Sequence, residues 1–113
     1  MRSLMRSLVV LGAMGVSAAA SAGSVTNATI TKLVMGTNEG DYVFIQVNVA
    51  KSSNPSCSTS SLYSFAFPLS STTENQMLAL LLSARATQTP VALYGTGLCS
   101  NFSNIETLEI VEY

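Results

Sequence analysis

One predicted helix constrains the fold of this chain more than any other feature. Ser71 followed by Glu74 has the spacing of a capping box, in which the two side chains satisfy amide groups left unpaired at a helix start. The segment from Glu74 to Thr87 contains neither Gly nor Pro. Pro90 follows shortly, and proline disfavours helical geometry in the residue before it. The sequence therefore predicts a helix that begins at Ser71 and ends before Pro90.

The apolar arc of this helix is unusually wide. On a helical wheel it covers roughly 200°, more than the stripe a surface helix needs; its members are Met77, Leu78, Leu80, Leu81, Leu82 and Ala84. Two interpretations stay open. Loops and a sheet of the same chain could cover the whole arc, or Met77, Leu80 and Ala84 could meet another subunit, which would make the chain a homo-oligomer.

Residues 1–22 have the pattern of a signal peptide. A basic start is followed by the apolar segment Leu8–Val16 and by the small-residue cleavage site Ala20-Ser21-Ala22. The apolar segment is shorter than the about 20 residues that span a membrane, so we expect no stable membrane insertion. We predict an exported protein, periplasmic or secreted, whose residues 23–113 form a single small domain.

The charge balance of that domain excludes some partners. Lys32, Lys51 and Arg85 are its only cationic residues and stand against six carboxylates, a net charge of about −3. Because no basic patch is available to neutralise phosphates, we expect no nucleic-acid partner.

The two cysteines, Cys57 and Cys99, both follow the predicted cleavage site. An even number of cysteines in an oxidising compartment predicts one disulfide. For a loop of this length the chain-entropy model gives a stabilisation of about 4 kcal/mol. The sequence contains no histidine, so the cysteines cannot complete a four-ligand zinc site, and we predict no metal and no cofactor.

The remaining apolar patterns predict five strands, at residues 28–35, 42–49, 62–67, 91–94 and 105–113. The first two should form a hairpin, with Val43 and its alternate neighbours facing a core. In the third, Tyr63 should share a face with Phe65 and Phe67. Gly95 and Gly97 should form a flexible turn that delivers Cys99.

In the last strand, Leu108 and Ile110 should share a face. Glu106, Glu109 and Glu112 are predicted to line a solvated edge rather than an acid-base or cation site. The overall order is three strands, a helix and two strands.

Five strands and one helix in a partly open barrel are the pattern of an OB-fold. The chain also resembles the receptor-binding subunits of pentameric bacterial toxins, the family that includes the binding subunit of subtilase cytotoxin. The resemblance lies in the export signal, Cys57 before the third strand, the helical segment 74–84, the strand 91–94 and Cys99 just after it. It implies a ring of five chains around a channel lined by the helices, and recognition of host glycans. It assigns no sugar-contacting residue in this chain.

Catalysis is not expected. Histidine, the commonest general base, is absent, Asp41 is the sole aspartate, and no G-x-S-x-G motif occurs. We predict a non-catalytic binding module for a glycan or protein receptor. An envelope protein that has a structural or interaction role and no small ligand is the alternative.

A ligand site would use hydrogen-bonding and aromatic groups on the non-core strand faces. The candidates are Tyr42, Gln46, Asn48 and Tyr94. Each of them could instead be an ordinary surface residue of a strand.

Overall fold

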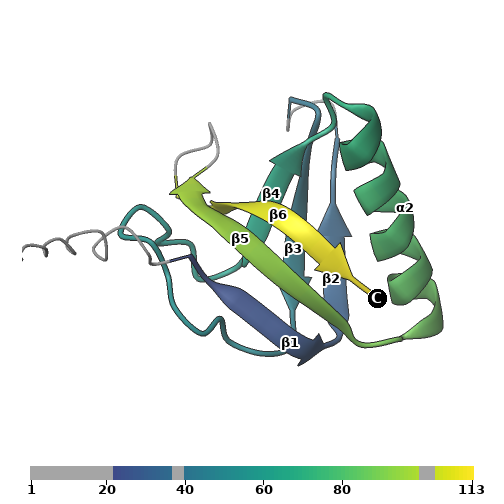
Figure 1. Cartoon of the computed structure of the whole chain (residues 1–113), viewed down its shortest axis with the longest axis horizontal. Helices are drawn as coiled ribbons and strands as arrows, with labels where there is room; N and C mark the ends of the chain where they lie inside the picture. The colour runs from purple at the N-terminus through teal and green to yellow at the C-terminus, as the bar shows by residue number, and fades with distance from the viewer. Residues whose placement is uncertain (1–21, 37–39, 100–103) are drawn as a thin grey trace, which may run out of the picture.

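The computed structural model describes residues 22–36, 40–99 and 104–113 (Figure 1). In these ranges the chain is mainly β with one helix. The elements in order are β1 (Ser24–Ala28), β2 (Ile30–Val34), β3 (Tyr42–Val47), β4 (Phe65–Pro68), α2 (Thr72–Thr87), β5 (Val91–Cys99) and β6 (Glu106–Glu112). Most of the predicted signal peptide and parts of the predicted turn at 37–41 and loop at 101–104 lie outside the described residues.

The strands form a single curled sheet, a half-barrel, in the order β1-β5-β6-β4-β3-β2. Neighbouring strands are antiparallel except β4 and β6, which run parallel. The predicted hairpin is confirmed, because β2 pairs with β3 from Ile30↔Val47 to Val34↔Phe44.

The predicted first strand, residues 28–35, corresponds to β2, and a further strand that was not predicted, β1, precedes it at the opposite edge of the sheet. Asn27 has a φ of 51°, and the register of β1 shifts between Val25 and Ala28. Only Thr29 separates β1 from β2, so the sheet has to curl until its two edges approach each other. Asn48 holds this junction: its side-chain Oδ1 accepts the Thr29 N–H at 2.9 Å, and its own N–H donates to the Thr29 carbonyl at 3.1 Å.

The helix forms as its caps predict. Ser71 is the N-cap and its Oγ accepts the Glu74 N–H at 3.2 Å. The Glu74 carboxylate accepts hydrogen bonds from the N–H and the hydroxyl of Ser70. Burial opposes ionisation of this carboxyl, but the hydrogen bonds from Ser70 and Ser71 outweigh it, and the pKa of Glu74 is lowered. At the other end Gln88, in the left-handed conformation, stops the helix before Pro90.

The main core lies between the helix and the sheet. α2 contacts β2 and β6 and contributes Met77, Leu81 and Ala84 to this core. Its largest sheet residues are fully buried: Phe65, Phe67, Ile30, Ile45 and Leu93. A smaller cluster of Phe44, Ala66 and Ile105 forms separately, with Tyr42 and Tyr63 packed against it.

The third predicted strand is shorter than expected, and its face assignment is wrong. Tyr63 does not share a face with Phe65 and Phe67. Its N–H donates to the Ser60 hydroxyl at 3.2 Å, which turns the chain before β4, and its ring lies 5.5 Å from that of Phe44. The residues just before β4 are therefore a turn and not an extended segment.

Two further corrections concern β5 and β6. The predicted turn at Gly95 and Gly97 is part of β5, which runs on to Cys99. In β6 the pairing skips Glu109, because Tyr94 pairs with Ile110 while Gly95 pairs with Leu108. This bulge reverses the alternation, so Leu108 is buried while Ile110 is exposed.

Candidate functional site

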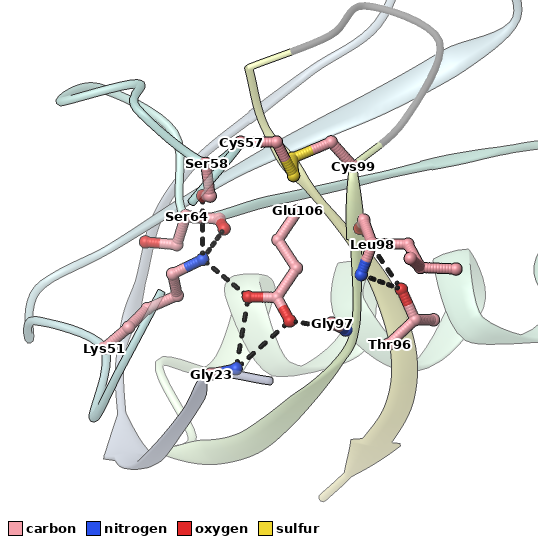
Figure 2. Close-up of a disulfide and its surroundings, with 10 residues drawn as sticks. All are labelled: Gly23, Lys51, Cys57, Ser58, Ser64, Thr96, Gly97, Leu98, Cys99 and Glu106. Carbon is pink, nitrogen blue, oxygen red and sulfur yellow. Dashed lines mark hydrogen bonds and ion pairs between the residues drawn. A yellow bond between two sulfur atoms is a disulfide. The ribbon is translucent and has the colours of Figure 1, made fainter. Parts of the chain in front are cut away.

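The predicted disulfide is confirmed (Figure 2). The Cys57 and Cys99 sulfurs are bonded, with the Cα atoms 6.1 Å apart. Cys57 lies in the long segment between β3 and β4, and Cys99 is the last residue of β5. The bond therefore fastens this segment to the sheet across a sequence separation of 42 residues.

Beneath the disulfide lies a buried ion pair (Figure 2). The Glu106 side chain is 0% exposed and that of Lys51 is 5% exposed, with the Lys51 Nζ atom 2.8 Å from Glu106 Oε1. This corrects the prediction that Glu106 lines a solvated edge. β6, whose first residue is Glu106, starts at the end of the sheet away from α2 (Figure 1).

Backbone groups complete the surroundings of the Glu106 carboxylate. The Gly97 N–H donates to Oε2 at 2.9 Å, and the Gly23 N–H lies 3.2 Å from Oε1 and 3.1 Å from Oε2. A Cβ atom on Gly95 would fall 2.1 Å from Oε2, so only glycine leaves room for the carboxylate here. These glycines thus serve close packing against Glu106, not a flexible turn.

Lys51 is equally well satisfied. Besides Glu106, its Nζ donates to the Ser58 hydroxyl at 3.2 Å and to the Ser64 carbonyl at 3.0 Å, and it lies 4.7 Å from the centre of the Phe65 ring. A buried charge is tolerated when it is paired and hydrogen-bonded in this way. Both groups are engaged with each other, which fits a structural centre that holds the segment between β3 and β4 in place.

Above this centre the surface is hollowed into a polar groove of about 440 Å³. Hydroxyl and amide side chains predominate in its lining, which comprises Thr31, Gln46, Val47, Val49, Ala50, Lys51, Asn54, Ser60, Ser61, Leu62, Tyr63 and Ser64. The groove therefore offers several hydrogen-bond donors and acceptors beside one aromatic ring.

One of the four predicted ligand residues lines this groove. Gln46 accepts the Thr31 hydroxyl proton on Oε1 at 3.0 Å and donates from Nε2 to the Leu62 carbonyl at 3.2 Å. Tyr42 stacks on Phe44 at 6.5 Å, and Asn48 is used at the Thr29 junction.

Tyr94 lies elsewhere, on the paired strands β5 and β6. Its hydroxyl donates to Glu112 Oε1 at 3.1 Å. This hydrogen bond and the charge of Glu112 raise the pKa of Tyr94. The structure therefore does not bring Tyr94 together with Gln46.

The three predicted interface residues are divided between the core and the surface. Met77 and Ala84 are buried in the core of their own chain, whereas Leu80 is 40% exposed. Leu82, also on α2, is 51% exposed. Leu80 and Leu82 are two residues apart and therefore lie on opposite flanks of the buried face of α2.

Sequence reasoning missed Lys51, Asn54 and Tyr63 as groove residues, and Glu106 as a buried group. The period of two along a strand places Glu106 on the same face as Leu108. Because that face is predicted to be apolar, the sequence did contain a signal for the burial of Glu106. Lys51 and Asn54 lie in a segment rich in Ser and Asn that has no periodicity to interpret.

Comparisons with protein-family models, with curated proteins and with solved structures found no significant match. Within residues 22–36, 40–99 and 104–113, no cluster of three or more His, Cys, Asp or Glu side chains is arranged to hold a metal ion. The same ranges contain no helix that is both long and apolar enough to cross a membrane.

Proposed function

We propose that this chain is an exported, non-catalytic binding module and that its ligand, a glycan or a receptor carrying one, occupies the polar groove. The observation that carries the proposal is the composition of the groove: amide and hydroxyl side chains surround Tyr63 over a volume of about 440 Å³. Such a lining suits a neutral, hydroxyl-rich ligand, because each ligand hydroxyl both donates and accepts hydrogen bonds.

The rigidity of the groove walls also supports binding. The disulfide and the contacts of Lys51 fasten the segment that carries Asn54 and Ser60–Ser64. A wall that is already ordered loses little conformational entropy when a ligand binds, which favours affinity.

We further propose that the half-barrel is of the OB type. Three features support this: β1 and β2 act as one strand bent at Thr29 that pairs at both edges, the helix follows β4, and β4 runs parallel to β6. A partly open barrel of this type binds oligosaccharides in many proteins.

A glycan array probed with the purified exported protein tests the ligand proposal. Asn54→Ala and Gln46→Ala should each weaken binding about fivefold, the effect of losing one hydrogen bond. Tyr94→Ala is the matched control, because Tyr94 lies away from the groove and should leave affinity unchanged. Binding that responds to Tyr94→Ala and not to the groove variants would refute the assignment.

We propose, finally, that several copies assemble in the manner of a toxin binding subunit. The exposed side chains of Leu80 and Leu82 on α2 support this, because apolar side chains at that exposure gain free energy when a second copy covers them. Native mass spectrometry at micromolar concentration should show an oligomer that Leu80→Ser weakens, while Ala86→Ser, an exposed control on the same helix, should not.

A strict monomer would refute the assembly. A monomer that also binds no glycan would leave the alternative, an envelope protein with a structural or interaction role.

A further inference from the structure

The backbone nitrogen of Gly23 has an unusual position. Gly23 is buried, while Ala22 before it is exposed. Its N–H points at the fully buried Glu106 carboxylate and contacts both oxygens, at 3.2 and 3.1 Å (Figure 2). Ala22–Gly23 is also the peptide bond at which the sequence predicts removal of the signal peptide. The nitrogen that cleavage would free therefore already lies against a buried anion.

We propose that Glu106 is the binding site for the free amino terminus of the processed protein. Hydrolysis of the Ala22–Gly23 bond breaks the C–N bond and adds one water: the acyl carbon of Ala22 becomes a carboxylate, and the Gly23 nitrogen becomes an ammonium ion. A neutral amide donor is thereby replaced by a cation that pairs with Glu106. Charge-assisted hydrogen bonds of this kind are roughly twice as strong as neutral ones.

The residues around Gly23 leave no room for a side chain at this position. A Cβ atom at this position would lie 2.2 Å from the Ser53 carbonyl oxygen and 3.0 Å from Glu106 Oε1. The Gly23 carbonyl accepts the Gly95 N–H at 2.9 Å, and the Ser24 N–H donates to the Ser52 hydroxyl at 3.1 Å. Neither bond involves Ala22, so both remain after cleavage and continue to hold Gly23.

The charged groups that face the new ammonium are Glu106 on β6 and Lys51 in the segment after β3. Both Lys51 and Gly23 donate to Oε1. The pair is neutral before cleavage, and afterwards two cations share one carboxylate. The Ser53 hydroxyl donates to the Ala22 carbonyl at 3.0 Å, and once Ala22 has departed it remains beside the ammonium as a polar neighbour.

The test begins with the full chain, expressed with its own signal segment in a bacterial host and recovered after export. Intact mass should show a product that begins at Gly23. The matched control carries one serine inserted between Ala22 and Gly23. Its processed form therefore begins one residue before Gly23, and its amino group lies outside the site. Reductive methylation at neutral pH should modify the α-amino group of the Gly23 product at least tenfold more slowly than that of the control.

A second measurement does not depend on reactivity. Lys51→Met should lower the folding equilibrium constant at least tenfold more in the serine-extended protein than in the Gly23 product, because only the latter keeps a cation, its ammonium, beside Glu106. A product that begins at another residue, equal methylation rates, or equal effects of Lys51→Met in the two proteins would overturn the proposal. Its outcome is independent of whether the groove binds a glycan.

Discussion

Glu106→Gln is the most informative single substitution in this protein. The change keeps the size of the side chain but removes the charge that pairs with Lys51 in the buried centre, where the two side chains are 0% and 5% exposed. Removal of one partner from a buried ion pair leaves the other charge uncompensated and costs about 3–5 kcal/mol. That is a large share of the about 5–15 kcal/mol by which small domains are stable.

Urea unfolding of the oxidised protein, followed by circular dichroism at pH 7, measures this cost. The midpoint should fall with little change in the slope of the transition, since the folded state stays as compact. Glu109→Gln is the matched control on the same strand, because Glu109 is exposed, and it should change stability by less than about 0.5 kcal/mol.

Two outcomes would refute this reasoning. One is a loss below about 1 kcal/mol for Glu106→Gln, the size of an ordinary hydrogen bond. The other concerns the double variant with Lys51→Met, which removes both side-chain charges of the pair while the amide oxygen introduced at position 106 still accepts from the backbone. It should be more stable than Glu106→Gln alone, and lower stability would show that the unpaired lysine is not the cause of the loss.

Four further predictions concern the disulfide, the packing against Glu106 and the start of the helix. Replacement of Cys57 and Cys99 by serine should lower the free energy of unfolding by about 4 kcal/mol, measured by denaturant titration against the oxidised protein. Gly95→Ala should cost about 1–3 kcal/mol or prevent folding, because its Cβ would fall 2.1 Å from the Glu106 carboxylate; a neutral effect in thermal melts would contradict the packing described. Ser71→Ala should cost about 1 kcal/mol through loss of the helix cap. The lowered pKa of Glu74 means that its stabilisation is present above pH 4.5, its ordinary value, and is lost as the pH falls through the folded-state pKa, so Glu74→Gln should flatten the loss of stability in acid melts.

Local signals account for what the sequence predicted correctly. The cap at Ser71 and the β2–β3 hairpin depend on neighbouring residues. The prediction of the disulfide depends on the even number of cysteines and on the oxidising compartment that the signal peptide predicts. The break between β1 and β2 could not be predicted, because Asn27 adopts its left-handed conformation where the sheet edges meet, which is a property of the whole fold.

The packing around Glu106 is a second feature that local sequence signals did not predict. Gly95 and Gly97 have the composition of a turn, and nothing in the neighbouring residues indicates that a carboxylate of another strand takes the place of a side chain. Within the candidate groove, only Gln46 was predicted, since it belongs to a regular strand whose alternation places it opposite the apolar face. Asn54 lies in an irregular segment, where only the tertiary structure decides what comes together.

The bend at Thr29 also determines how much of the sheet edge another molecule could pair with. The sheet ends in two strands of five residues each, β1 and β2, and they diverge from a single residue. An incoming strand from another molecule would find only a short row of unpaired backbone groups on either edge, and on β2 it would meet the exposed Lys32. Only 10% of the residues are charged, so charge repulsion between molecules is weak. Short edge strands are then the main feature that limits edge-to-edge pairing of the sheets. The short edges therefore disfavour the addition of a strand from another molecule.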